Sequence, residues 1–338
     1  AALNRCLAPA SKAGMAVWYQ GTVLRRLLPV AVNQLTSQRF WDHMSYLDAD
    51  RIGLIEQDLT RTLIERFRVD LSCLLYDTTN FYTFIDSFNE RNSLAQRGKS
   101  KEQRMALRIV GLALLVTKDF HIPLFHHVYP GNVHDATTFA SVTETLVARY
   151  RLFAENVDGI TLVYDKGNNS QESQERLDDS PYHFVGSLSP AQHPDLIEIP
   201  GSRFHPLVGE GLDGVLACRT RKEVLGAERT LLVVYNPELF LAQCGTILRE
   251  IRNRTRKLKE LQLHLAHPPK RGKPLTIESV HKQVQAILSG RHMRDLIQTE
   301  VTQKDRMTHL SYCVDQTAWQ RLQRTLLGKN ILFTDQDS

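Results

Sequence analysis

The sequence predicts an α/β fold: a mixed five-stranded sheet with helices on its faces. The first observation is a pair of apolar segments, residues 71–76 and 160–164, which have the length of buried strands. Each is followed by an aspartate, Asp77 or Asp165. The second observation is the order of segments within residues 69–188, which reads strand, two strands, helix, strand, helix, strand. Helical crossovers between strands are what parallel neighbours require.

The composition is that of an ordinary globular protein. The chain has 338 residues, 42% hydrophobic and 23% charged, with a net charge of +5. This length predicts two or three domains. No apolar run approaches the roughly 20 residues of a membrane span, and no secretory signal opens the chain, so a cytoplasmic location is expected. The five cysteines are scattered, which favours reduced thiols over disulfides or a zinc site.

The first domain, residues 1–68, is predicted to be helical. Either Asp48 or Asp50 is placed to cap a long helix. One face of that helix carries apolar side chains, those of Ile52, Ile55, Leu59, Leu63 and Phe67. Basic residues open the chain, with Trp18 and Tyr19 between them. Two interpretations remain open: a module that contacts DNA, or a helical cover for the next domain.

The second domain, residues 69–188, is the predicted core. Its first strand is expected to be buried on both faces, which makes the charge of Asp77 costly without a partner. Two further strands are expected at 107–117 and 122–129, joined as a hairpin. The polar segment before them is basic and contains Arg97, Lys99 and Lys101. These side chains could follow a DNA backbone, and the alternative is a solvated loop.

A turn at residues 130–135 is predicted to lead into a helix at 136–153, with Asp135 as its N-cap. His126 and His127 fall on opposite faces of a strand, which disfavours a shared metal ion. The core is completed by the strand before Asp165, a helix at 170–177 and a strand at 182–188.

The third region, residues 189–338, is predicted to be a β-rich insertion. A long helix is expected from Pro237 to about Ala266, because proline is favoured at the first helical position. Its apolar residues form one stripe, Leu248, Ile251, Leu258, Leu261 and Leu265. Much of the basic set is thereby left exposed for contact with nucleic acid, including Arg252, Arg256 and Lys259. A small α+β unit is expected from residue 277 to residue 334.

Asp77 and Asp165 are the candidate catalytic and metal-binding residues. The carboxyl ends of parallel strands meet at one edge of an open sheet, so the two carboxylates are expected to share a site. Two carboxylates can hold Mg²⁺ or Mn²⁺, whereas the lack of a Cys or His cluster argues against zinc. The alternative is that both are turn or cap residues, and Asp165 before Lys166 and Gly167 could start a turn.

Three sequence blocks carry a resemblance. They are Leu-Tyr-Asp-Thr-Thr at 75–79, Pro-Gly-Asn-Val-His-Asp at 130–135 and Val-Tyr-Asp-Lys-Gly-Asn-Asn-Ser at 163–170. With residues 4–12 and 37–42, they resemble bacterial insertion-sequence transposases of the DDE class, over most of the chain. The resemblance implies a ribonuclease-H-like core with a β-rich insertion after its fifth strand. It also implies that Asp77 and Asp165 are the first two of three metal-binding acidic residues.

The third acidic residue implied by the resemblance is not found. In the family it is a Glu on a helix, four residues after an Arg that itself follows a Tyr by three, with a Lys seven residues beyond the Glu. None of the ten tyrosines has an arginine three residues later, so no glutamate is assigned. The chain is therefore expected to be a fragment or the product of a decayed element, and catalytically impaired.

Two functions are expected to compete. The first is a Mg²⁺-dependent transposase that hydrolyses DNA at insertion-sequence ends and joins the 3′-hydroxyl to target DNA. The second is a truncated protein that binds double-stranded DNA at terminal inverted repeats without cutting it. A metal phosphohydrolase with a small substrate is less favoured, because dispersed basic segments suit a polymer. The resemblance also implies a homodimer when active, at the nucleoid in bacterial cytoplasm.

Overall fold

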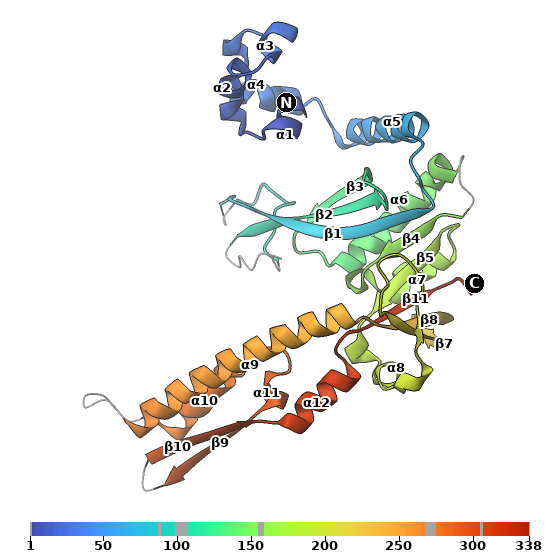
Figure 1. Cartoon of the computed structure of the whole chain (residues 1–338). Helices are drawn as coiled ribbons and strands as arrows, with labels where there is room; N and C mark the ends of the chain where they lie inside the picture. The colour runs from blue at the N-terminus through green and yellow to red at the C-terminus, as the bar shows by residue number, and fades with distance from the viewer. Residues whose placement is uncertain are drawn as a thin grey trace. The chain divides into compact units, whose positions relative to one another are not determined.

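The computed structural model describes residues 2–86, 89–98, 107–154, 159–267, 275–304 and 307–337 (Figure 1). The chain forms two units. The first contains residues 1–70 and 114–126, and the second contains residues 71–113 and 127–338. Lys99 and Lys101 lie outside the described residues. Within the described ranges, no helix is both long enough and apolar enough to cross a bilayer.

The first unit begins with short helices around a buried tyrosine. The helices are α1 (Ala2–Leu7), α2 (Met15–Gln20), α3 (Leu24–Leu27) and α4 (Ser37–Met44), with 3-10 turns at Lys12–Gly14 and Val32–Gln34. The hydroxyl of buried Tyr19 donates to the carbonyl of Leu28 at 2.7 Å and accepts from the amide of Val30 at 2.9 Å. These bonds hold the segment after α3 against α2.

Helix α5 (Ala49–Phe67) follows, and Asp48 is its N-cap because the Asp48 carboxylate accepts from the amide of Arg51 at 2.8 Å. The predicted apolar face is not the buried one. Thr60 and Ile64 are buried, whereas the exposed fractions of the predicted face are large: 38% for Ile52, 48% for Ile55, 59% for Leu59 and 63% for Phe67. Apolar spacing alone therefore assigned the wrong face.

Hydrogen bonds to strand β3 (Pro123–Pro130) set the orientation of α5. The Glu56 carboxylate accepts from the amide of His126 at 2.7 Å, and the Thr60 hydroxyl donates to the carbonyl of Leu124 at 3.0 Å. The His126 ring also contacts Glu56. Because β3 is the outermost strand of its sheet, these side chains satisfy backbone groups that an edge strand would leave open.

Within the described residues the main sheet has nine strands, whereas five were predicted for the core. Besides β3 they are β1 (Cys73–Thr83), β2 (Arg108–Thr117), β4 (Thr161–Tyr164), β5 (His183–Leu188), β6 (His205–Pro206), β7 (Leu216–Val224), β8 (Ala227–Tyr235) and β11 (Lys329–Thr334). Their order is β3-β2-β1-β4-β5-β11-β8-β7-β6. The sheet continues past β5 because β11 pairs antiparallel with both β5 and β8. The α/β class is confirmed, whereas a separate five-stranded sheet is not, because β11, β8, β7 and β6 extend the sheet beyond β5.

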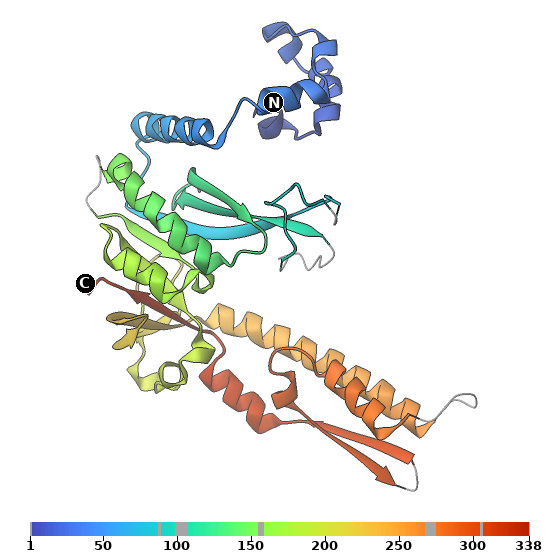
Figure 2. The same cartoon turned by 180° about the vertical axis from the view of Figure 1, so that it is seen from behind.

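The centre of the sheet is parallel, as predicted: β4 pairs with β1 on one side and with β5 on the other. Helices α6 (Asp135–Ala154) and α7 (Gln171–Asp178) lie on one face of the sheet (Figure 2). Phe139 of α6 packs between two tyrosines of the sheet, with ring centroids 4.6 Å from Tyr76 and 4.9 Å from Tyr164. A Cβ added at Gly186 of β5 would lie 2.4 Å from the Phe333 ring, so this core admits only glycine there.

Strand β1 differs from its prediction in two ways. It continues through Asp77 to Thr83 instead of ending before the aspartate. Its burial alternates, with Leu74, Tyr76 and Thr78 buried and Leu75 half-buried, so it is not buried on both faces. One face of β1 is thus covered by α6, and the other carries Asp77 in an exposed position.

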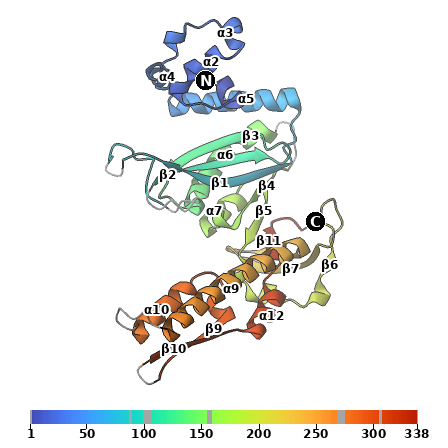
Figure 3. The ribbon, with the colours of Figure 1, turned by 60° about the vertical axis from the view of Figure 1, so that its left-hand side comes forward.

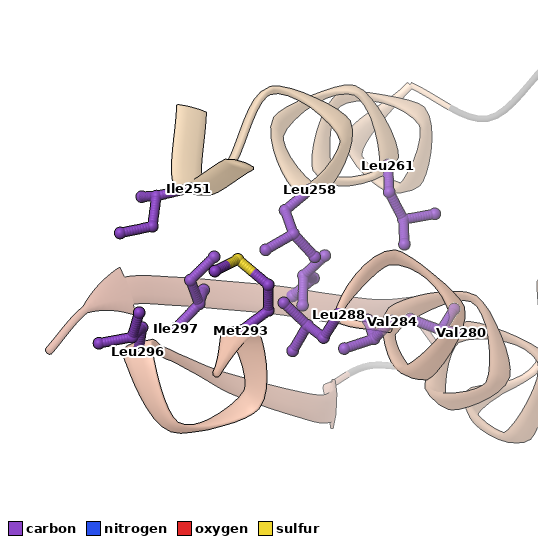
Figure 4. Packing of buried hydrophobic residues seen from close by; sticks show 10 residues of the cluster. Ile251, Leu258, Leu261, Val280, Val284, Leu288, Met293, Leu296 and Ile297 are labelled. Carbon is purple, nitrogen blue, oxygen red and sulfur yellow. The ribbon is translucent and has the colours of Figure 1, made fainter. Parts of the chain in front are cut away.

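The segment between β8 and β11 has a hydrophobic core of its own. It contains α9 (Pro237–Ala266), α10 (Ile277–Ile287), α11 (Met293–Leu296), α12 (Gln316–Thr325) and the antiparallel pair β9 (Ile297–Lys304) and β10 (Met307–Val314). Helices α9 and α10 lie beside the β9–β10 pair (Figure 3). The buried side chains are Ile251, Leu258, Leu261, Val280, Val284, Leu288, Met293, Leu296, Ile297 and Leu310 (Figure 4). Helices and strands therefore occur within the α+β unit predicted at 277–334, but its last strand, β11, belongs to the main sheet.

Helix α9 begins and ends where the sequence predicts. Asn236 is its N-cap, accepting from the amides of Glu238 and Leu239, and Pro237 is the first helical residue. Its predicted apolar stripe is correct except at one position. Leu248 is 47% exposed, because the buried side passes through Cys244 and Ile251 instead.

Candidate metal centre

Asp77 and Asp165 occupy matching positions on adjacent parallel strands. The register pairs Tyr76 of β1 with Tyr164 of β4, so each aspartate is the next residue in its chain segment. Neighbouring strands lie about 4.8 Å apart, and alternate residues point to the same face. Both aspartates therefore lie on the face opposite the two buried tyrosines, and both are exposed. The expected meeting of these two carboxylates at one place on the sheet is supported by this register.

Ser187 of β5 holds the Asp165 carboxylate. The Ser187 hydroxyl donates to Oδ1 of Asp165 at 2.9 Å and accepts from the amide of Lys166 at 3.0 Å. The side-chain amide of Asn169 donates to the Ser187 carbonyl at 2.7 Å. These bonds fix the loop after β4 against the end of β5, so the carboxylate has a defined orientation although it is exposed.

A polar chain lies on the other face of β1, beneath Asp77. The Asp77 carboxylate accepts from the amide of Thr78 at 2.7 Å. The buried Thr78 side chain hydrogen-bonds the Tyr129 hydroxyl, which donates to the Asp135 carboxylate at 2.8 Å. Burial, and then the hydrogen bond to Asp135, raise the pKa of Tyr129, so its phenol stays protonated and remains a donor at neutral pH.

This network corrects the role expected of Asp135. Asp135 is the first residue of α6, and its carboxylate binds Tyr129. The carbonyl of the preceding residue, His134, accepts the first helical hydrogen bond, from the amide of Thr138 at 3.1 Å. His134 thus stands at the capping position, and the aspartate ties α6 to β3.

Close packing explains why residue 131, in the turn at 130–135, is a glycine. A Cβ added at Gly131 would lie 2.0 Å from the carbonyl oxygen of Ile109, a backbone atom that cannot turn aside. The Gly131 amide donates to the carbonyl of Leu94 at 3.2 Å. The turn that precedes Asp135 is therefore pressed against two other segments, and only glycine fits it.

The oxygen ligands at the two aspartates suit a hard divalent cation. Asp77 and Asp165 supply carboxylate oxygens, and the Asn169 side-chain oxygen nearby is buried without a hydrogen-bond donor. Mg²⁺ is commonly held by one or two carboxylates, with water and substrate phosphate completing its shell. Among the described residues, no three His, Cys, Asp or Glu side chains gather closely enough to hold a metal. Two carboxylates are thus what this centre offers.

The basic candidates fall into two places. Arg97 is exposed just before the described range breaks off at residue 98. Arg252, Arg256 and Lys259 are exposed on α9, on the side opposite buried Leu258, and Arg249 extends their row. The spacing of three, four and three residues puts all four cations on one stripe of the helix. None of the four makes an ion pair within the described part of the chain.

Sequence reasoning missed Ser187, Thr78 and Tyr129. Ser187 could have been predicted from the sequence. It lies two residues after Val185, hence on the same face of the strand, at the end of the strand beside Asp165. For Tyr129 and Thr78 no local signal existed, since their hydrogen bond depends on how β1, β3 and α6 pack together.

No protein-family model matches the chain, and no curated protein matches it either.

Proposed function

We propose that the protein is a DNA-cleaving and DNA-joining enzyme of the DDE transposase class, with Asp77 and Asp165 as ligands of Mg²⁺ or Mn²⁺. The observation that carries this proposal is the register of β1 and β4, which gives the two aspartates matching positions on one exposed face of the sheet. The proposed substrates are double-stranded DNA at insertion-sequence ends and target DNA. Pairing of two ends by a homodimer belongs to the same proposal.

The order of the strands and helices supports the proposal of a ribonuclease-H-like core with a β-rich insertion. Strands β1 to β5 are contiguous in the sheet, α6 leads from the edge strand β3 into β4, and α7 connects the parallel strands β4 and β5, which suits a ribonuclease-H-like core. The segment from β6 to α12 follows β5 and contains most of the remaining strands, which suits a β-rich insertion. A third acidic residue is not assigned, because the tyrosine–arginine spacing that would mark it does not occur.

Each residue of the centre has a distinct task in this proposal. A bound Mg²⁺ would polarise a phosphodiester oxygen and lower the pKa of a coordinated water. Asp77 and Asp165 would hold the ion, and the Ser187 hydroxyl would keep the Asp165 carboxylate oriented. The exposed Lys166 ammonium adds positive charge beside Asp165, which favours approach of a phosphate.

Metal binding tests the site directly. Asp165→Asn and Asp77→Asn are each expected to weaken Mn²⁺ binding by about tenfold or more, because each removes a charged ligand. Ser187→Ala should have a smaller effect in the same direction. Binding is measured from the electron paramagnetic resonance signal of free Mn²⁺. Asp213→Asn, at an exposed site in another loop, is the matched control. Equal affinity in the wild type and in both ligand variants would contradict the assignment.

A second candidate function, DNA binding without cleavage, is favoured by the row of cations on α9 that form no ion pair with any other described residue. Replacing Arg249, Arg252, Arg256 and Lys259 together with glutamine should weaken duplex binding. It should also reduce the slope of log K against log salt by about three to four, since each phosphate contact contributes roughly 0.9. Fluorescence anisotropy across a salt series measures both quantities.

The control removes the same charge elsewhere. Lys118, Arg203, Lys282 and Arg294 are exposed residues outside α9, and their replacement with glutamine should leave the slope nearly unchanged. Equal losses in the two sets would show that net charge, rather than the α9 row, governs binding. Asp77→Asn and Asp165→Asn should retain duplex affinity, which separates binding from chemistry.

A further inference from the structure

A pocket of about 1000 Å³ lies in the part of the chain after β5 and has no role in the proposed metal centre. Its walls come from the segment after α8 (Pro194–Ile197), the ends of β7 and β8, the start of α9, and α12. None of the residues that line it belongs to β1, β4 or the loop after β4. Its volume is at the upper end of the range for small-molecule sites, roughly 300 to 1000 Å³.

Three half-buried aromatic side chains line the pocket: Phe204, Tyr235 and Phe240. The Tyr235 and Phe240 rings lie 6.0 Å apart at an angle of 52°. Both come from rigid elements, since Tyr235 ends β8 and Phe240 lies in the first turns of α9. The Lys329 ammonium lies 5.8 Å from the centroid of the Phe204 ring, and the three side chains together give the pocket an aromatic surface that a planar ligand can contact.

The pocket is also cationic. Arg321 and Arg324 of α12 and Lys329 of β11 line it, against one carboxylate, that of Glu198. Lys329 is half-buried, its ammonium donates to the carbonyl of Ile197, and burial lowers its pKa. The guanidinium groups of Arg321 and Arg324 make no ion pair or hydrogen bond within the described residues. Two arginines are therefore free to bind an anion.

Packing on the far side of α12 positions these arginines. Ala318, Trp319 and Leu322 pack against the hydrophobic core that α9, α10 and β9 share. A helix that buries that side leaves Gln320 and Arg324 on the opposite side, and both line the pocket. Asp315 caps the helix by accepting from the amide of Ala318 at 2.9 Å. The arginines thus project from an anchored helix rather than from a loop.

We propose that this pocket binds a nucleotide, with the base against the aromatic rings and the phosphate on Arg321 and Arg324. Ring faces bind any base by stacking, and arginine binds phosphate through two donors at once. An acidic peptide would use the arginines but would make less use of the aromatic side chains that line the pocket. The nucleotide could belong to a single strand of DNA or be free in solution, and both share the same chemistry.

The experiment uses the full chain and a fluorescent oligothymidylate about ten nucleotides long. Arg321→Gln and Arg324→Gln should each weaken its binding by roughly tenfold, and Phe204→Leu by a similar factor. Lys282→Gln and Arg294→Gln, which remove the same charge outside the pocket, should leave binding unchanged. Thermal melting of each variant confirms that the chain is folded.

Photocrosslinking locates the ligand independently of any substitution. An oligonucleotide that carries 5-bromodeoxyuridine should crosslink to a peptide containing Phe204, Tyr235 or Phe240. Competition by free thymidine monophosphate would identify the site as one for mononucleotides, and competition only by oligonucleotides would assign it to a DNA strand. Crosslinks elsewhere with unchanged affinity in the arginine variants, or displacement of the probe by an acidic peptide alone, would overturn the proposal. Asp165→Asn should leave all these results unchanged, so this pocket and the metal centre are tested separately.

Discussion

Asparagine at position 77 or 165 is expected to abolish metal-dependent nicking of DNA. Asparagine keeps the size of the side chain but removes the charge that would neutralise a divalent cation. Metal stabilisation of phosphodiester cleavage is worth several kcal/mol, so the loss in rate is about a hundredfold or more. The wild-type chain is expected to nick supercoiled plasmid slowly in Mn²⁺, since two of the three acidic residues implied by the resemblance are present.

Conversion of supercoiled to open-circular plasmid measures this rate. The matched control is again Asp213→Asn, which removes one exposed carboxylate away from β1 and β4. Duplex affinity of the Asp77 and Asp165 variants, measured in parallel, shows whether substrate binding is retained. Nicking at the wild-type rate in both variants would disprove the assignment of the centre.

Arg229→Met is expected to destabilise the protein by about 3 kcal/mol. The Arg229 side chain is 3% exposed and binds both oxygens of Asp178, with Nη1–Oδ1 at 2.9 Å and Nη2–Oδ2 at 2.7 Å. It also donates through Nε to the carbonyl of Val224 at 3.2 Å and lies over the Phe184 ring. The substitution removes the charged donor of the Asp178 carboxylate, which is 34% exposed and keeps a hydrogen bond of 3.4 Å from the Gln174 side chain, and it removes a donor from the Val224 carbonyl.

Urea unfolding followed by circular dichroism measures the loss. The double variant Arg229→Met with Asp178→Leu should recover part of it, because an apolar pair leaves no unpaired charge. Arg221→Met is the control, since Arg221 lies on the adjacent strand β7 with its side chain about half exposed and is expected to cost less than about 1 kcal/mol. Equal and small losses at both positions would show that the Arg229–Asp178 pair contributes little.

Local signals in the sequence were sufficient for single elements. Pro237 after Asn236 marks the start of α9, and Asp48 marks the start of α5, because proline and capping side chains act within one helical turn. The apolar runs before Asp77 and Asp165 correctly indicate adjacent parallel strands. These are cases in which the physical cause lies within a few residues of its effect.

What the sequence could not predict depends on distant partners. Strand β11 joins the sheet because Phe333 packs against Phe184 and Tyr164, residues from far earlier in the chain. The buried side of α5 was misassigned because Glu56 and Thr60 bind backbone groups of β3, and no helical periodicity reports such bonds. Asp135 was assigned to a cap because its partner, Tyr129, becomes its neighbour only through the turn at Gly131.

Because β11 pairs antiparallel with β8, the whole α9–α12 segment is a long connection between two neighbouring strands of the main sheet. Lys329 is the direct partner of Tyr235, so the chain leaves the sheet and returns to it at one pair of neighbouring residues. Such a segment can lengthen, shorten or change its surface while the two strands keep their register, since only the distance between its ends is constrained. Its stability comes from its own core, whereas its attachment depends on two strands. The basic row of α9 and the two pocket arginines of α12 are therefore carried on a segment that can vary independently of the aspartates at the centre of the sheet.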